Sequence, residues 1–283
     1  MILRHSFHLA LLTTIITVWV GAAAAQNNFS GGDLLNATYK PSCASDGADK
    51  PIAVKDGKYS YEKQEDGYTD RFYFEVFDIV YGDLTGDGKD EAVALTTCNT
   101  GGTGNFTEGF IFGSKNGKAV LLATLPGGDR AYGGIRKAWI DRGRLVVETN
   151  DPGELGAACC PAEIVTSTYK LAGKKLVESG KPTKRSIYPS QRVNFAKGKS
   201  EAVVKLTIRG DEGAELVLRA NKGQTMTVTT NDEASGAVLS NDAKITQIDN
   251  GFRAVLSETG YQSIRLDNGA AESVTVTVTI RIR

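Results

Sequence analysis

The chain has 283 residues, enough for one large domain or two domains of ordinary size. Its 33 Lys and Arg residues balance 33 Asp and Glu residues, which excludes the basic excess that proteins carry when they bind nucleic-acid phosphates. A hydrophobic content of 41%, with 23% charged residues, supports buried cores and excludes a wholly disordered chain.

The first 25 residues have the order of features that export signals share. Arg4 supplies a positive start, Leu9–Val20 is an apolar segment, and Ala23-Ala24-Ala25 ends a run of small residues. The apolar segment is shorter than the about 20 residues that a membrane helix requires, so no integral membrane protein is expected. We predict a signal peptide over residues 1–25, cleavage near Ala25 and Gln26, and a periplasmic or secreted mature protein.

Both histidines of the chain, His5 and His8, lie inside the predicted signal. Cleavage would therefore leave no imidazole to act as a general base or to activate a nucleophile near neutral pH. No feature of the sequence pairs two carboxylates in the way that glycoside hydrolysis requires. We therefore expect a protein that is not an enzyme.

Residues 26–180 form a predicted N-terminal antiparallel β domain. Apolar and polar residues alternate along most segments, and the chain's 32 glycines interrupt it often, as short strands and tight turns require. One short helix is predicted near Asp33–Ala37. The predicted strands are Phe72–Tyr81, Glu91–Thr97, Gly109–Phe112, Ala119–Thr124, Ile135–Ile140, Leu145–Thr149, Glu163–Leu171 and Lys175–Glu178.

Residues 181–191 are predicted to be a linker, because basic residues and prolines replace core residues there. About eight short, regularly spaced strands follow in residues 192–283, which favours a jelly-roll-like β-sandwich as the C-terminal domain. The chain as a whole is thus predicted to be all-β, with two domains. The predicted strands of the second domain are Ala202–Ile208, Ala214–Arg219, Thr225–Thr230, Ala237–Ser240, Lys244–Ile248, Phe252–Leu256, Tyr261–Leu266 and Ser273–Ile282.

Four cysteines follow the predicted signal: Cys43, Cys98, Cys159 and Cys160. In an oxidising compartment an even count predicts disulfides, and four cysteines allow three pairings. A bond between the adjacent cysteines would close a strained eight-membered ring. We therefore expect Cys43 and Cys98 each to bond one member of the Cys159-Cys160 pair, with the order of the two bonds left open.

The segment 83–91 carries the most specific short pattern, with oxygen-bearing side chains at alternate positions and glycines for a sharp bend. Such a pattern is typical of loops that surround a hard cation such as Ca²⁺. The sequence does not predict an EF-hand, because position twelve is Ala94 rather than a bidentate acid and the flanking segments are predicted strands. The candidate ligands are Asp83, Thr85, Asp87, the carbonyl of Lys89, and Glu91.

These nine residues resemble the calcium loop of integrin-type FG-GAP and VCBS repeats, and no second copy is found. The resemblance implies carboxylate ligands from Asp83, Asp87 and Glu91. Thr85 replaces the family's usual Asp or Asn, and Glu91 replaces its usual Asp, which predicts weak binding, with a Kd of roughly 10⁻⁴ to 10⁻³ M. The alternative is an Asp-Gly turn between two strands, held by Asp side chains that bond local amides.

The last 90 or so residues resemble the periplasmic inhibitors of g-type lysozyme and the related bacterial pre-peptidase C-terminal sandwich. The resemblance implies a jelly-roll-like sandwich. In this chain a short turn, Asp267–Ala271, stands where the family often has a longer Arg-bearing turn. The N-terminal segment resembles exported bacterial proteins with no assigned chemistry. The segments that carry the C-terminal resemblance are Arg192–Gly198, Leu218–Gln224 and Gly260–Leu266.

The sequence as a whole predicts an exported, non-catalytic binding protein of the cell envelope, with a weak structural calcium site. Its predicted partner is an envelope protein or a carbohydrate. One alternative is a periplasmic inhibitor of g-type lysozyme, which would make lysozyme the partner. The other alternative is a carboxylate-dependent, carbohydrate-active hydrolase, against which the lack of imidazole argues.

Overall fold

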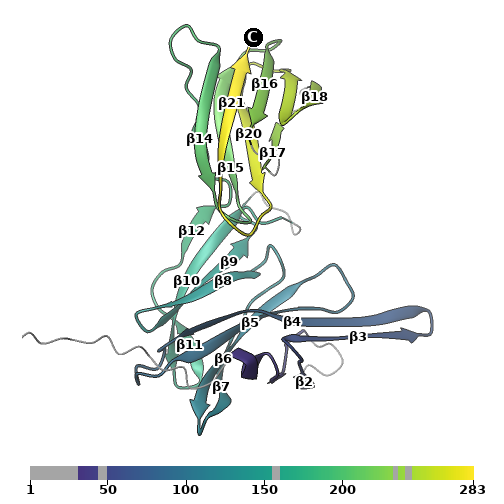
Figure 1. Ribbon diagram of the computed structural model, residues 1–283, viewed down its shortest axis with the longest axis vertical. Helices are drawn as coiled ribbons and strands as arrows, with labels where there is room; N and C mark the ends of the chain where they lie inside the picture. The colour runs from purple at the N-terminus through teal and green to yellow at the C-terminus, as the bar shows by residue number, and fades with distance from the viewer. Residues whose placement is uncertain (1–30, 44–49, 155–159, 232–234, 240–243) are drawn as a thin grey trace, which may run out of the picture.

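The computed structural model describes residues 31–43, 50–154, 160–231, 235–239 and 244–283, and these residues are almost entirely β-strand (Figure 1). The predicted signal peptide and its cleavage point lie outside this part of the chain. A single short helix, α1 (Gly31–Leu34), begins two residues before the predicted one. The prediction of an all-β fold with several antiparallel sheets is confirmed. No helix among the described residues is long and apolar enough to cross a membrane.

The first sheet of the N-terminal domain is built from five consecutive antiparallel strands. Every second side chain of a strand points to the same face, and in the second strand Phe72, Phe74 and Val76 are buried while the residues between them are more exposed. This alternation of apolar and polar residues explains why the segment forms a strand. The pairing of the second strand shifts at a bulge between Val76 and Asp78. The strands are β3 (Lys58–Glu65), β4 (Tyr68–Gly82), β5 (Glu91–Asn99), β6 (Phe106–Lys115) and β7 (Lys118–Leu125).

A second sheet packs on one face of the first. Its strand order is β11-β10-β9-β8, and β12 also pairs with β10. Val93, Leu95 and Ile111 from the first sheet form a buried core with Leu145 and Val147 from the second. The strands are β8 (Ile135–Asp141), β9 (Arg144–Asp151), β10 (Glu163–Ala172), β11 (Lys175–Glu178) and β12 (Thr183–Ser186).

The other face of the first sheet is covered by α1 and by two short strands, β1 (Thr38–Tyr39) and β2 (Ile52–Ala53). Tyr39 is buried there against Phe74 and Phe110, with ring centroids 5.3 and 5.1 Å away. The Tyr39 hydroxyl donates to the backbone oxygen of Leu34 at 2.8 Å, which ties the helix to the strand that follows it.

A disulfide joins Cys43 to Cys98, with their Cα atoms 6.6 Å apart. The predicted pairing of each with a member of the Cys159-Cys160 pair is therefore wrong. Both cysteines belong to the core beneath β1 and β2, whereas Cys160 lies just before β10 in the other sheet, and sequence spacing does not reveal this division. Cys160 is itself disulfide-bonded, and Cys159 lies outside the described residues.

The C-terminal domain is two sheets around one core, in which Leu216, Val228, Phe252, Ile264 and Val278 are buried. One sheet has the order β13-β15-β20-β17 and the other β14-β21-β16-β19-β18. The strands of the first are β13 (Ser190–Arg192), β15 (Gly213–Ala220), β20 (Gly260–Asn268) and β17 (Ser235–Leu239). Those of the second are β14 (Glu201–Ile208), β21 (Val274–Ile282), β16 (Thr225–Thr230), β19 (Gly251–Val255) and β18 (Lys244–Ile248).

The segment 181–191, which the sequence predicts to be a linker, contains β12 and the start of β13. Between them, the Ile187 amide donates to the Ala162 oxygen at 3.0 Å, and the Ile187 oxygen accepts from the Gly213 amide at 3.1 Å. One residue is thus hydrogen-bonded to both domains. The two domains lie end to end, with the C-terminus at the far end of the sandwich (Figure 1).

Candidate functional site

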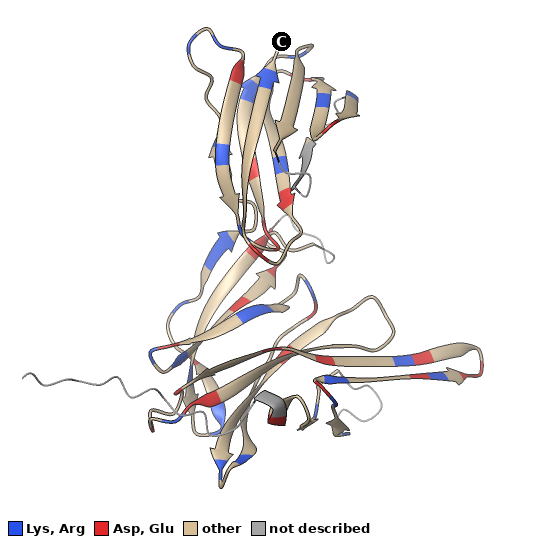
Figure 2. Cartoon of the chain, viewed as in Figure 1, with Lys and Arg blue, Asp and Glu red and all other residues tan. Residues whose placement is uncertain are grey.

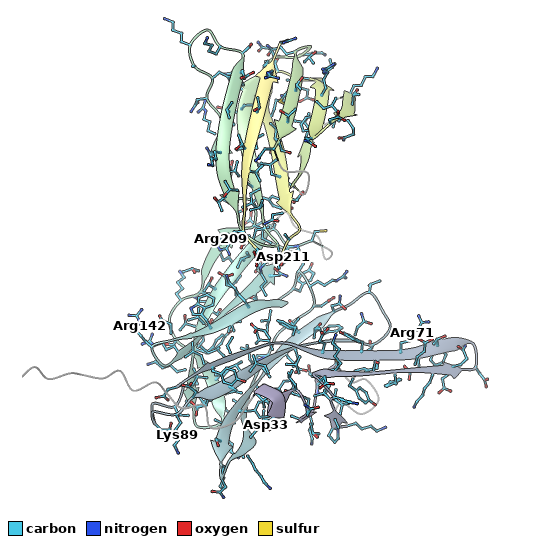
Figure 3. The ribbon with its side chains drawn as sticks, viewed as in Figure 1. Asp33, Arg71, Lys89, Arg142, Arg209 and Asp211 are labelled. Atoms are coloured by element: carbon cyan, nitrogen blue, oxygen red, sulfur yellow. A yellow bond between two sulfur atoms is a disulfide. The ribbon has the colours of Figure 1, made fainter. Side chains whose placement is uncertain are left out.

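The predicted calcium loop connects β4 to β5, and two of its carboxylates bond amides of the loop itself. Asp83 accepts from the amides of Gly86 at 2.6 Å and Gly88 at 2.9 Å, and Asp87 accepts from the amide of Lys89 at 2.9 Å. The Gly88 amide is the main reason that the pKa of Asp83 is lowered. Figure 3 labels Lys89, which shows where this loop lies in the N-terminal domain.

Glu91 turns inward instead and is only 5% exposed. Its Oε2 accepts from the amides of Leu84 at 2.9 Å and Thr85 at 3.0 Å. Burial raises the pKa of Glu91, and the nearby charges of Asp87 and Asp83 add to this. The carboxylate of Glu91 therefore lies near enough to Asp83 and Asp87 for their charges to disfavour its ionised form.

These contacts match the Asp-Gly turn that the sequence analysis offers as the alternative. Within the described residues, no group of three or more His, Cys, Asp and Glu side chains is gathered as a metal site. Calcium binding by Asp83, Thr85, Asp87, Lys89 and Glu91 stays a prediction.

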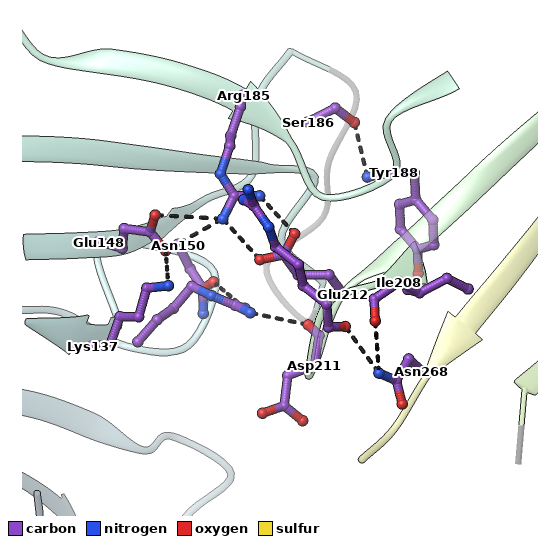
Figure 4. A network of polar contacts seen from close by, with 12 residues as sticks. Lys137, Glu148, Asn150, Arg185, Ser186, Tyr188, Ile208, Asp211, Glu212 and Asn268 are labelled. Carbon is purple, nitrogen blue, oxygen red and sulfur yellow. Dashed lines mark hydrogen bonds and ion pairs between the residues drawn. The ribbon is translucent and has the colours of Figure 1, made fainter. Parts of the chain in front are cut away.

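A polar network closes the junction between the two domains (Figure 4). Arg185 donates to both carboxylate oxygens of Glu212, at 2.6 and 2.8 Å, and its Nη2 lies 3.3 Å from Glu148 Oε2. Lys137 forms a second ion pair with Glu148 at 3.3 Å. Arg136 donates to Asn150 Oδ1 at 3.2 Å and, across the junction, to the Asp211 backbone oxygen at 3.0 Å.

Beside this network lies a cavity of about 680 Å³, which we call the junction groove. Its two buried carboxylates, Glu148 and Glu212, are held by arginine and lysine, so neither is arranged as a free general acid or base. Arg209 and Asp211 are among the lining residues, and Figure 3 labels them where the two domains meet. The lining residues are Arg136, Lys137, Glu148, Arg209, Gly210, Asp211, Glu212, Ala271 and Ser273.

The outer face of the β13-β15-β20 sheet gathers two tyrosines and three arginines, which we call the Tyr–Arg face: Tyr188, Arg192, Arg219, Tyr261 and Arg265. Tyr261 is 65% exposed, and the Arg192 guanidinium lies 5.9 Å from its ring centroid. Arg219 is the direct cross-strand neighbour of Tyr261. The exposed ring of Tyr261 thus has the Arg192 guanidinium over it and Arg219 beside it on the neighbouring strand.

Tyr188 extends this face toward the junction. Its hydroxyl donates to Asp267 Oδ1 at 2.5 Å, and the guanidinium of Arg265 lies 5.2 Å from its ring centroid. Burial, together with the bond to Asp267, raises the pKa of Tyr188 to about 12. The phenol is therefore neutral and fixed in place at physiological pH.

The Tyr–Arg face is not identifiable as a site from the sequence. The available signal was the alternation along β20, which places Tyr261, Ser263 and Arg265 on one side of the sheet. The sequence does not predict that Tyr188 and Arg192 belong to this face, because both lie in or beside the segment predicted as a linker.

No family model matches the chain, and no curated protein matches it. Among solved structures it is similar to PliG of Aeromonas hydrophila, a periplasmic inhibitor of g-type lysozyme, at 22% identity and a TM-score of 0.31 over 34% of this chain and 97% of that one. PliG of Salmonella Typhimurium matches at 18% identity and a TM-score of 0.28, over 34% and 98% of the two chains. An exo-β-1,3-galactanase of Phanerochaete chrysosporium matches at 8% identity and a TM-score of 0.18, over 80% and 68%.

Proposed function

We propose that the protein is an exported, non-catalytic binding protein of the cell envelope that holds a protein partner on its Tyr–Arg face. The observation that carries the proposal is the exposed ring of Tyr261, with Arg192 over the ring and Arg219 directly across from it on the neighbouring strand. Tyrosine and arginine are the side chains most enriched at the energetic centres of protein interfaces. They also give large contact areas for a small loss of side-chain freedom when a sheet holds them in place.

The shape and charge of this face favour a protein over a small ligand. Its side chains stand on paired strands and not in a closed pocket, so a partner would meet a broad, rigid surface. Arg192, Arg219 and Arg265 make the surface basic, although Glu215 and Asp267 lie among them. A partner with exposed carboxylates or carbonyl oxygens would be complementary to it.

Export is supported by the disulfide chemistry as well as by the signal pattern. The Cys43–Cys98 bond and the bonded state of Cys160 are typical of proteins that fold in oxidising compartments. A non-catalytic role is supported by the junction groove, where arginine and lysine hold the buried carboxylates. The loop at residues 83–91 would then stabilise the N-terminal domain, with or without bound calcium.

Paired variants on opposite faces of the sandwich test the proposal. Tyr261→Ala truncates the exposed ring, and Val203→Ala is its control, because Val203 is 61% exposed on the other sheet. We expect formaldehyde crosslinking in the producing cells to yield a discrete complex that Tyr261→Ala reduces at least about tenfold, as loss of a central aromatic contact predicts, and that Val203→Ala retains. Equal yields from both variants, or no complex at all, would contradict the proposal.

Inhibition of a g-type lysozyme is the second candidate function, and one observation bears on how it would work. Two residues of the motif that resembles the inhibitor family, Tyr261 and Arg265, lie on the Tyr–Arg face. The short turn Asp267–Ala271 instead faces the N-terminal domain, since Ala271 lines the junction groove. An inhibitory contact would therefore use the face and not the turn.

A lysis assay tests this candidate directly. Added protein is expected to slow bacterial lysis by g-type lysozyme, and Tyr261→Ala/Arg265→Ala is expected to lose the effect while Val203→Ala keeps it. Undiminished lysis at saturating protein removes lysozyme as the partner. The crosslinking experiment would still decide whether the face binds another protein.

A further inference from the structure

A cluster of arginines stands on the other side of the sandwich, on the outer face of the β14-β21-β16-β19-β18 sheet. The strand register puts Arg281 of β21, Thr227 of β16 and Arg253 of β19 in one row across three neighbouring strands. Strands two places apart are separated by about 10 Å, so both long side chains can reach the space above Thr227. Arg283 and Thr225 occupy the next row, joined by two backbone hydrogen bonds.

These five residues line a cavity of about 410 Å³. This volume falls within the range of small-ligand sites, roughly 300–1,000 Å³. The lining offers three guanidinium groups and two threonine hydroxyls, all of which can donate hydrogen bonds. No acidic side chain is part of the lining, so the cavity presents donors and positive charge to whatever enters it.

Only part of the positive charge of this cluster is paired with a carboxylate. Arg281 pairs with Glu201 at the edge of the cluster. Arg253 and Arg283 have no ion-pair partner in the part of the chain that the structure describes. Lys244 adds a further cation, since it faces Val255, the neighbour of Thr225. Like charges held this close repel one another, and a bound anion would remove that cost.

The position of the cluster in the molecule leaves it accessible. It lies at the end of the sandwich away from the N-terminal domain, where Figure 2 shows Lys and Arg near the C-terminus. Arg253, Arg281 and Arg283 are all exposed. It also lies on the opposite sheet from the Tyr–Arg face, so it does not depend on the proposed function.

We propose that Arg253, Arg281 and Arg283, with Thr225 and Thr227, bind a phosphate group. Arginine forks match the geometry of phosphate oxygens and bond them two at a time. A phosphate carries up to two negative charges and several acceptor oxygens, which is enough to engage more than one of the three arginines at once. The threonine hydroxyls supply further donors at the floor of the cavity.

The phosphate has two possible sources, a free phosphate ester or the headgroup of an anionic lipid, and two probes separate them. The first probe is glycerol 3-phosphate, titrated calorimetrically. The second is co-sedimentation with vesicles of phosphatidylglycerol and phosphatidylcholine, compared with phosphatidylcholine alone. Binding of the first probe identifies a free ester, and binding to the anionic vesicles alone identifies a lipid headgroup. Either result supports the proposal.

The deciding variant is Arg253→Gln/Arg281→Gln. Its control is Arg142→Gln/Arg144→Gln, which removes the same charge from an exposed hairpin of the N-terminal domain (Figure 3). We expect the first variant to weaken binding at least about tenfold and the control to change it less than about twofold, since only the first removes charged hydrogen bonds to the ligand. Both should melt close to the unmodified protein, because exposed ion pairs add little stability.

A third variant tests whether the paired hydrogen bonds of the arginine side chains matter in addition to their positive charge. Arg253→Lys/Arg281→Lys keeps both positive charges and is expected to bind more weakly than the unmodified protein, because lysine cannot make the paired bonds. Failure of both probes to bind, or equal losses in the deciding variant and its control, would overturn the proposal.

Discussion

Arg185 on β12 bonds both carboxylate oxygens of Glu212, with Nη1–Oε2 at 2.6 Å and Nη2–Oε1 at 2.8 Å. The Glu212 side chain is only 7% exposed, so this charged pair is largely removed from water. β12 belongs to the N-terminal sheet and Glu212 immediately precedes β15 of the sandwich. Together with the backbone bonds of Ile187, the pair fixes the two domains to each other.

Removal of Arg185 should destabilise the protein strongly. Arg185→Ala would leave Glu212 buried without its main partner, and the expected loss is about 2–3 kcal/mol, below the cost for a fully buried pair because Arg185 itself is partly exposed. Lys184→Ala is the neighbouring control. Its partners Asp151 and Glu163 are more exposed than Glu212, and its expected loss is much smaller than that of Arg185→Ala. Urea denaturation measures both values, and equal losses would contradict this role of the junction pair.

The junction should weaken in acid. Burial raises the pKa of Glu212, but the bonds to Arg185 and the charges of Arg136 and Arg209 outweigh it, so the pKa is lowered overall from its ordinary 4.5. A carboxylate with a lowered pKa stabilises the fold fully above that ordinary value, and its contribution is lost as the pH falls through the lowered one. The free energy of unfolding should therefore decline below about pH 4.5, more steeply in the unmodified protein than in Arg185→Ala. Identical pH profiles would exclude Glu212 as a source of the decline.

Gly213 should not tolerate a side chain. A Cβ atom at this position would lie 2.2 Å from the Tyr188 ring and 2.7 Å from the Leu266 carbonyl oxygen. Gly213→Ala should therefore cost about 1–3 kcal/mol and displace Tyr188, lowering its pKa from about 12 toward 10 in a spectrophotometric titration. Gly269→Ala is the control, because a Cβ there meets nothing within 4 Å. A Tyr188 pKa that stays at about 12 in Gly213→Ala would show that the ring is not held by this contact.

Calcium is expected to stabilise the loop at residues 83–91 modestly. With a Kd of about 1 mM, 10 mM calcium would add about 1.4 kcal/mol, or a rise in Tm of about 3–6 °C. Asp83→Asn/Asp87→Asn should lose this shift, while magnesium serves as the cation control for the unmodified protein. A melt unchanged by calcium, or shifted equally in the variant, would leave the segment as a plain Asp-Gly turn.

Local patterns in the sequence were sufficient to predict most strands. Strict alternation in residues 274–282 predicts β21, and Val276, Val278 and Ile280 are indeed buried in the sandwich core. The turn residues Asp141-Arg142-Gly143 between two alternating segments predict a hairpin. In the structure, Arg142 and Gly143 both have the positive φ that such a turn uses. In such segments one face of the strand is buried and the other is not, so burial can be inferred residue by residue.

Features that depend on distant contacts could not be predicted in this way. The disulfide partner of Cys43 depends on how β1 folds over β5. The basic residues near Arg185 are typical of a solvated linker, and only the fold shows that Arg185 pairs with Glu212. Neither the Tyr–Arg face nor the arginine cluster is continuous in the sequence. Each forms only when strands far apart along the chain become neighbours in a sheet.

The most direct measurement of the central claim is site-specific photo-crosslinking in the producing cells. A photoreactive amino acid is placed at Ser263, on the same side of β20 as Tyr261, in one protein and at Val203 in another, and adducts are identified by mass spectrometry. The account predicts a discrete protein adduct from position 263 that is absent from position 203. No protein adduct from position 263, or the same adducts from both positions, would contradict it.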